Sequence, residues 1–180
     1  MSAIEGAARL DPEVYMAQGP IVEIDRADVD ALVDGARRSG KRKSRLLLHP
    51  HSADSLHEML IVHCRDEYIR PHRPLKTSKS YHVVRGTMTI VLFEVDGTFR
   101  QAIALGDHKR GGAFMARIMG PWFHTLVPTT ETVAFIETVP GPWLRTDYAP
   151  WAPPADGSAA ARSYHARLKA AARPPRAKKP

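Results

Sequence analysis

The sequence TMTIVLFEVDGTFRQAI, from Thr87 to Ile103, contains two runs of β-forming residues divided by Asp96-Gly97. Branched and aromatic side chains favour extended backbone in both runs. The Asp-Gly pair supplies the positive φ angles that a tight primed turn requires. The stretch therefore predicts an antiparallel β-hairpin whose tip lies at Gly97.

Similar short runs lie on both sides of this hairpin. They are rich in β-branched or aromatic residues, and Gly, Pro or Asp separates them. Such a series predicts a mainly all-β fold, an antiparallel jelly-roll β-barrel with its core at about residues 46–139. The runs are 46–48, 59–62, 81–84, 87–95, 99–105, 113–118 and 132–139.

The flanking segments complete the predicted organisation. A short amphipathic helix is expected near residues 26–38, with Asp25 or Asp28 as its N-cap and Gly40 at its end. Residues 1–24 carry weak patterning and are interpreted as a loosely attached N-terminal arm. Residues 140–156 are rich in proline, which excludes them from the interior of a sheet. Residues 156–180 are interpreted as a basic tail, rich in Ala and Pro, that is either helical or disordered, with a surface helix at 158–173 and a disordered end as the helical alternative.

The net charge of +7 belongs to the C-terminal tail. Residues 157–180 hold 7 of the 26 basic residues and no acidic one, which leaves 19 basic against 19 acidic residues in the rest. A second basic cluster lies at 37–45. Since no aromatic residue interleaves there to stack on bases, nucleic acid is not an expected partner.

The sequence contains no apolar run long enough to cross a bilayer, and its first twenty residues lack the apolar region of a secretory signal. The single cysteine, Cys64, fits a reducing compartment. These features predict a cytoplasmic protein without a membrane partner.

Two sets of motifs resemble known families. Ile69-Arg70-Pro71-His72, followed by 80–86 and 90–93, resembles the first cupin motif. Further matches narrow the resemblance to the WbuC-type cupin-fold metalloproteins over about residues 25–155. These matches are 37–39, 47–49, 122–127, 131–133, 140–142 and 148–153. The resemblance implies a cupin domain over that range, a setting in surface-polysaccharide or sugar metabolism, and a homodimer paired edge to edge. It implies no defined reaction.

The resemblance also implies a metal site of three imidazoles and one carboxylate. The matching positions are His72, Pro74, Lys79 and His124. Pro74 has no donor atom, and the Lys79 ammonium repels a dication. Because two histidines alone hold zinc, iron or manganese weakly, we expect a degenerate metal site and no firmly bound cofactor.

Lys79 allows two interpretations. If it points into the barrel beside His72 and His124, it places a cation where the metal normally sits. A carboxylate or phosphate would then be attracted between walls such as Tyr81 and Val83. Alternatively, Lys79 extends to the barrel mouth and the pocket is vestigial.

The remaining histidines are interpreted as structural or exposed. His82 lies three positions after Lys79 and is expected on the opposite face of the strand. The same interpretation applies to His49, His51, His57 and His63.

Three classes of function remain open. The first is a non-metal module that binds a small anionic or sugar-like ligand through His72, Lys79, Tyr81 and His124. The second is a metal-dependent cupin enzyme, an isomerase or oxygenase, that uses His72, His124 and ligands not yet identified. The third is an interaction of the basic tail with nucleic acid or acidic surfaces. The sequence assigns no catalytic residue.

Overall fold

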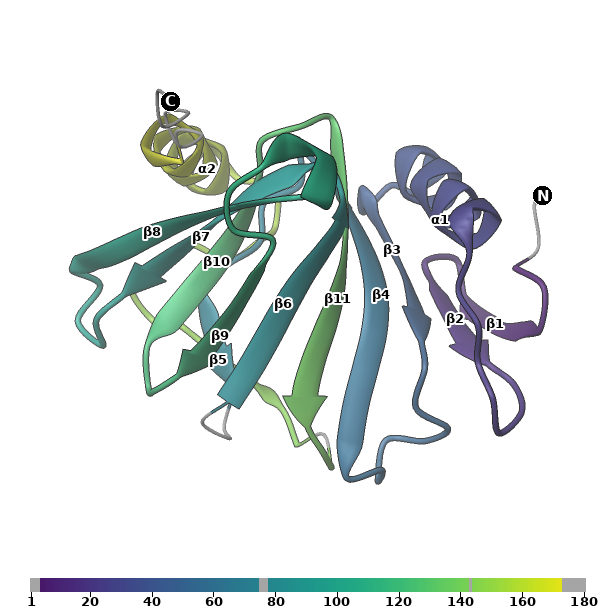
Figure 1. The fold of residues 1–180 in the computed structure, drawn as a ribbon. Coiled ribbons are helices and arrows are strands. Elements are labelled where there is room, and N and C mark those ends of the chain that lie inside the picture. Colours follow the sequence, from purple (N-terminus) through teal and green to yellow (C-terminus); the bar gives the residue numbers. More distant parts are fainter. Residues whose placement is uncertain (1–3, 75–77, 143, 173–180) are drawn as a thin grey trace.

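The computed structural model describes residues 4–74, 78–142 and 144–172, and its strands form two sheets (Figure 1). The 7-stranded sheet has the order β1-β2-β3-β4-β11-β6-β9, and the 5-stranded sheet has the order β12-β5-β10-β7-β8. The strands are β1 (Ala7–Asp11), β2 (Val14–Ala17), β3 (Lys43–Leu47), β4 (Leu56–Cys64), β5 (His72–Pro74), β6 (Ser78–Arg85), β7 (Thr87–Phe93), β8 (Phe99–Gly106), β9 (Met115–Met119), β10 (Phe123–Pro128), β11 (Thr132–Pro140) and β12 (Thr146–Tyr148). The helices are α1 (Arg26–Arg38), α2 (Ala159–Ala171) and a 3₁₀ turn at His108–Arg110.

Strands that lie far apart in the sequence are neighbours in both sheets. β11 lies between β4 and β6, and β10 lies between β5 and β7. The strand pairs are antiparallel except for β2 with β3, which is parallel. This arrangement of two facing sheets confirms the predicted mainly all-β jelly-roll fold.

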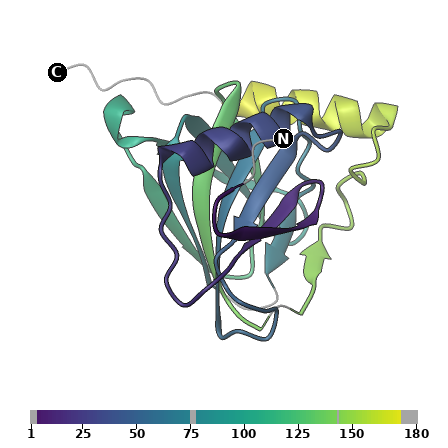
Figure 2. The same cartoon turned by 90° about the vertical axis from the view of Figure 1, so that its right-hand side faces the viewer.

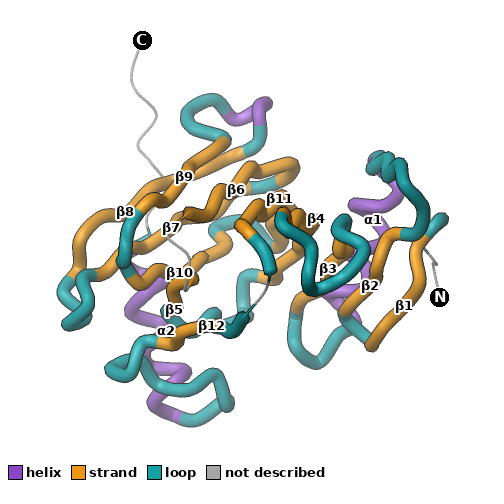
Figure 3. The backbone as a smooth tube through the Cα atoms, turned by 90° about the horizontal axis from the view of Figure 1, so that it is seen from below, coloured by secondary structure: helices purple, strands orange, loops and turns teal. Residues whose placement is uncertain are grey.

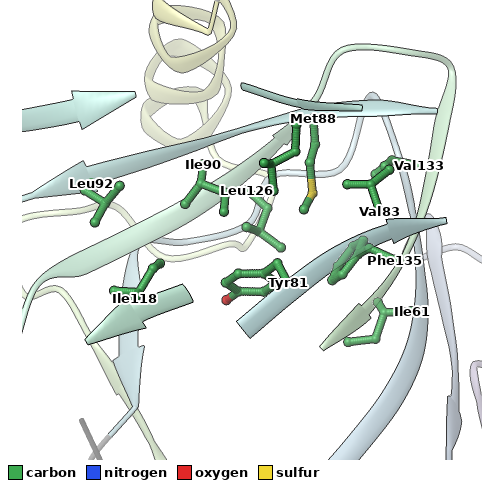
Figure 4. Close-up of a cluster of buried hydrophobic side chains, with 11 residues drawn as sticks. Ile61, Tyr81, Val83, Met88, Ile90, Leu92, Ile118, Leu126, Val133 and Phe135 are labelled. Atoms are coloured by element: carbon green, nitrogen blue, oxygen red, sulfur yellow. The ribbon is translucent and has the colours of Figure 1, made fainter. Parts of the chain in front are cut away.

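Alternation along the strands divides the apolar residues between the inside and the outside of the two sheets. On β4, Ile61 packs in the cluster between the sheets, whereas Leu60 and Val62 pack against α1. The inner cluster is shown in Figure 4, where Tyr81 and Phe135 lie in the same core as Leu126 of the opposite sheet. The inward face of each strand therefore determines which side chains reach the space between the sheets.

One helix covers the outer face of each sheet (Figures 1 and 2). α1 begins at the Asp25 cap, where a capping box with Asp28 satisfies the first backbone amides. The predicted helix at 26–38 is thus confirmed, although Ser39 rather than Gly40 is its C-cap. α2 packs Leu168 against the outer face of the 5-stranded sheet. The tail therefore contains a docked helix over residues 159–171, and residues 173–180 lie outside the described residues.

The N-terminal segment is not a loose arm. β1 and β2 form a hairpin that extends the 7-stranded sheet beyond β3, as Figure 3 shows from below. Its weak sequence pattern has a physical reason: most β1 side chains are exposed, and the hairpin contributes to the apolar cluster beneath α1 through Ala7, Tyr15 and Ala17.

Ion pairs engage most of the basic cluster at 37–45. Each pair joins a basic residue of α1, of β3 or of the loop between them to a carboxylate elsewhere in the chain, which leaves less charge free for phosphate than the sequence indicates. The pairs are Arg37–Glu131 at 3.1 Å, Lys41–Glu13 at 3.1 Å, Arg42–Asp66 at 2.9 Å and Lys43–Glu67 at 3.1 Å.

Among the described residues, no helix is both long and apolar enough to span a membrane.

The hairpin between β7 and β8 differs from the predicted primed turn. The amide of Gly97 donates to the carbonyl of Glu94 at 3.1 Å, and the amide of Glu94 donates to that of Thr98 at 2.9 Å. Gly97 has a φ of 92°. Asp96 does not have a positive φ, because Arg42 is the only non-glycine residue of the described chain that does. The loop is therefore a turn followed by a left-handed glycine, because Asp96 does not adopt the second positive φ that a type I′ turn needs.

Replacing Gly97 with alanine is expected to lower the free energy of unfolding by about 1–2 kcal/mol. An alanine here would have to adopt the same positive φ, and its Cβ atom would lie 2.9 Å from Cδ2 of Trp151. Gly111→Ala is the matched control, since Gly111 has a φ of 68° and nothing within 4 Å of its added Cβ. Urea unfolding should show the larger loss for Gly97→Ala. Equal losses would mean that the Trp151 contact carries no cost.

Candidate functional site

A cavity of ≈620 Å³ lies between the two sheets. Residues of β3, β4, β6 and β11 line it on one side, and residues of β5 and β12 line it on the other. His72, Pro74 and Lys79 are among the lining residues. The volume is within the range of pockets that hold small-molecule ligands.

Lys79 points inward and forms a buried ion pair with Glu137. Its Nζ atom lies 3.2 Å from Oε1 of Glu137, and the two side chains are 9% and 12% exposed. Burial raises the pKa of Glu137, but the attraction of Lys79 and smaller effects outweigh it, so the pKa is lowered and the carboxylate is ionised. The Lys79 charge is therefore already balanced. This corrects the expectation that Lys79 alone attracts an anionic ligand.

Glu137 was not among the predicted site residues. A signal for it exists, because Val133, Phe135 and Glu137 alternate on β11 and the first two are fully buried. A carboxylate at the next inward position of such a strand requires a buried partner.

Tyr81 and His124 lie behind the cavity rather than in its wall. Both are 0% exposed, and Figure 4 shows Tyr81 inside the apolar cluster. The Tyr81 hydroxyl lies 2.7 Å from Nε2 of His124. Burial, followed by the charge and the hydrogen bond of Glu137, raises the pKa of Tyr81. The Tyr81 hydroxyl therefore keeps its proton and can donate it in a hydrogen bond. Hydrogen bonds therefore link His124, Tyr81, Glu137 and Lys79 in one buried chain.

His72 faces the cavity and is neutral. It pairs with His124 across β5 and β10, and the two ring centroids lie 4.8 Å apart. Nδ1 of His72 donates to the carbonyl of Arg70 at 3.0 Å, since a carbonyl oxygen can only accept. Burial, followed by the charge of Lys79, lowers the pKa of His72 to about 4. Burial, followed by the effects of His72 and of Lys79, lowers the pKa of His124.

The residues present do not fit the divalent metal that the family resemblance implies. Nε2 of His124 is bound to Tyr81, and the positive charge of Lys79 acts on both imidazoles and would repel a dication. In the parts of the chain that the structure describes, no group of three or more His, Cys, Asp or Glu side chains could hold a metal ion.

Lowering the pH from 7 to 4 is expected to reduce the free energy of unfolding, with His72 contributing up to about 3 kcal/mol of the loss. Unfolded His72 takes up a proton near its ordinary pKa of 6.5, whereas folded His72 stays neutral to about 4. The unfolded state therefore binds more protons in this window, so stability falls with pH. Urea unfolding at several pH values should show a flatter profile for His72→Gln than for wild type and for the exposed control His51→Gln. Identical profiles would show that His72 is not held neutral.

The other predicted histidine positions divide into two groups. His82 packs against Phe114 outside the cavity, with ring centroids 5.4 Å apart, and His51 is exposed. His49, His57 and His63 line the cavity. The rings of His49 and His57 stack, with their centroids 4.0 Å apart. The interpretation of the three residues as structural or exposed did not foresee that they lie together in the cavity wall.

The cavity wall carries an excess of positive charge. Its six basic side chains face two carboxylates, and three of the cations have no ion-pair partner among the described residues. The basic residues are Lys43, Arg45, Arg70, Arg73, Lys79 and Arg145, and the acidic residues are Glu67 and Glu137. The cations without a carboxylate partner are Arg45, Arg70 and Arg145.

Three solved structures illustrate what this chain is similar to. A protein from Shewanella oneidensis superimposes with a TM-score of 0.45 and 11% identity over 56% of this chain and 65% of its own. A cupin 2 conserved barrel domain protein from Rhodopseudomonas palustris gives 0.46 and 13%, over 59% of this chain and 66% of its own. An RmlC-like cupin family protein from Methanocaldococcus jannaschii gives 0.43 and 16%, over 58% and 86%. The match thus spans less than two thirds of the first two proteins.

The sequence itself matches one family model, that of a domain of unknown function, DUF6016, over residues 24–105. A search of curated proteins found no match. The narrower resemblance to WbuC-type proteins stays a prediction.

Proposed function

We propose that this chain binds a small anionic ligand, such as a sugar phosphate or a carboxylate, in the cavity between its sheets. The observation that carries the proposal is the set of cations without carboxylate partners in the cavity wall. Arg45, Arg70 and Arg145 line the same cavity, while Lys79 and Lys43 are each held by a glutamate. Guanidinium groups bind phosphate and carboxylate through paired hydrogen bonds.

Two of these arginines are prepared for such a ligand. Arg45 is an inward residue of β3, and its charge lowers the pKa of Glu137, which places it within electrostatic reach of the Lys79 pair. Arg70 is held by the carbonyl of Ala149 at 2.8 Å and lies over the Tyr148 ring at 5.3 Å, while its Nε has no hydrogen-bond partner. A guanidinium that such contacts already fix loses little entropy when it binds an anion.

The wall also offers groups that suit a sugar-like ligand. Tyr148 and the neutral rings of His72 and His49 line the cavity beside apolar residues such as Leu47. Aromatic and apolar surface with a few polar groups is typical of pockets that bind small organic molecules. A sugar phosphate would also agree with the sugar metabolism that the WbuC-type resemblance implies.

Isothermal titration calorimetry of the full chain with glucose 6-phosphate, fructose 6-phosphate, pyruvate and uncharged glucose tests this proposal. At least one anion should bind, glucose should bind more weakly than its phosphate, and added salt should weaken anion binding. Arg45→Gln should weaken binding about tenfold or more, because a charged hydrogen bond is lost.

Arg38→Gln is the matched control, since Arg38 is 62% exposed and lies outside the cavity. It should leave the affinity unchanged. If no anion binds, or if Arg38→Gln and Arg45→Gln weaken binding equally, the cavity is not the anion site.

A further inference from the structure

A second buried cluster lies in the cavity wall, away from Lys79. Nδ1 of His63 hydrogen-bonds Oε2 of Glu67, and Nζ of Lys43 lies 3.1 Å from Oε1 of the same carboxylate. The His63 and Glu67 side chains are 10% and 8% exposed. His63 also stacks on Phe135, with ring centroids 5.5 Å apart, so packing fixes the plane of the imidazole.

The hydrogen bonds determine which nitrogen of His63 carries the proton. Burial raises the pKa of Glu67, but His63 and then Lys43 outweigh it, so the pKa is lowered and the carboxylate is ionised. An ionised carboxylate only accepts hydrogen bonds, so Nδ1 of His63 is the donor. In the tautomer with the proton on Nδ1 the lone pair is on Nε2, which has no hydrogen-bond partner among the described residues.

The register of the sheet places a cation beside this imidazole. Lys43 pairs with His63 across β3 and β4, and Arg45 pairs with Ile61 on the same inward face. Diagonal neighbours on one face of a sheet are within reach of long side chains. An anion held by Arg45 would therefore place the adjoining part of the ligand on the face of the sheet that carries the His63 imidazole.

We propose that His63 is the general base of a proton-transfer reaction on an anionic carbonyl compound held by Arg45. The inference rests on the proposed anion binding and adds a reaction to it. An imidazole oriented by a carboxylate is the usual arrangement of a protein general base, because the second group fixes both the tautomer and the ring.

The reaction is an exchange of one proton next to the carbonyl group. The C–H bond breaks, the proton passes to Nε2 of His63, and the electron pair moves to the carbonyl oxygen to give an enolate. In a 2-oxo acid such as pyruvate the carbonyl oxygen adjoins the carboxylate that Arg45 holds, so the same guanidinium stabilises that negative charge. Return of the proton from Nε2 to carbon restores the neutral imidazole, so the step requires no oxidant and no second substrate. Isomerisation or exchange with solvent protons is the result.

The experiment measures deuterium incorporation from D₂O into fructose 6-phosphate, dihydroxyacetone phosphate and pyruvate by NMR with the full chain. Wild type should accelerate exchange of at least one compound above the protein-free rate. His63→Gln should lose about 100-fold or more of that acceleration. Glu67→Gln should lower kcat about tenfold with little change in KM. The imidazole of His63 stays in place, but no carboxylate then holds the proton on Nδ1.

His51→Gln, an exposed histidine outside the cavity, is the control and should exchange like wild type. Thermal melting shows whether each variant is folded. If His63→Gln is unfolded, carbethoxylation of wild type supplies the second measurement: loss of exchange should follow modification of His63 and be slowed by inorganic phosphate.

Calorimetry with the same compounds separates the two proposals. Binding without exchange in wild type overturns the role of His63 and leaves anion binding intact. Loss of binding together with exchange in folded His63→Gln also overturns it, since the imidazole then holds the ligand. Absence of binding and exchange in wild type overturns both.

Discussion

Lys79→Met is expected to lower the free energy of unfolding by about 3–5 kcal/mol at neutral pH. The change removes the cation that lies 3.2 Å from Glu137 and leaves a carboxylate buried between the sheets. A buried charge without a partner is costly, whereas the isolated loss of an exposed ion pair costs little. Urea denaturation followed by circular dichroism measures the difference.

Two comparisons give this prediction its control. The double variant Lys79→Met/Glu137→Met should recover most of the loss, because it removes both charges and preserves the volume. Arg100→Met breaks the exposed pair with Glu94 and should cost less than about 1 kcal/mol. A double variant as unstable as Lys79→Met alone would show that the methionine, not the unpaired carboxylate, causes the loss.

The sign of the pH dependence follows from the lowered pKa of Glu137. In wild type the pair stabilises the fold above the ordinary pKa of the carboxyl, and that contribution is lost as the pH falls through the lowered value. In Lys79→Met the carboxyl can relieve its burial by binding a proton. The cost of the substitution should therefore shrink in acid.

Zinc affinity is expected to rise about 100-fold or more in the double variant Pro74→His/Lys79→Glu. Pro74 and Lys79 line the same cavity as His72, and the substitutions replace a side chain without donors and a repelling ammonium. The apo variant should be less stable than wild type, because the new carboxylate lies beside Glu137 without a cation. Zinc should then raise its Tm more than it raises that of wild type.

The single variants separate the two effects. Pro74→His keeps the Lys79 ammonium, and Lys79→Glu keeps the proline, so each should gain less affinity than the pair. Equilibrium dialysis with zinc measures all four proteins. Tight stoichiometric zinc in wild type would contradict the conclusion that the present residues do not fit a metal.

Alternation made much of the fold predictable. β6, β7 and β8 follow from branched and aromatic residues with turn signals between them, and the Asp25 cap gives the start of α1. β10 was not predicted, because all six of its residues are buried and show no alternation. β5 and β12 have three residues each, too few for a periodic signal.

The candidate site was predictable in its residues but not in its pairings. Strand parity places Lys79 on the inward face with Tyr81, as expected from their spacing. Its partner depends on the register of β6 with β11, which sets Tyr81 opposite Glu137. Likewise, the His63 cluster requires Lys43 of β3 opposite β4. Registers between strands far apart in sequence depend on the whole sheet, which local patterns do not specify.

The location of the anion site is tested most directly by NMR of the full chain during titration with fructose 6-phosphate. We expect the perturbed signals to gather at the cavity, in the imidazoles of His63 and His72 and the backbone of β3 around Arg45, while those of α1 and α2 stay unchanged. Perturbations confined to the exposed basic residues of α2, such as Arg162 and Lys169, would contradict anion binding in the cavity, because the anion would then bind the surface and not the space between the sheets.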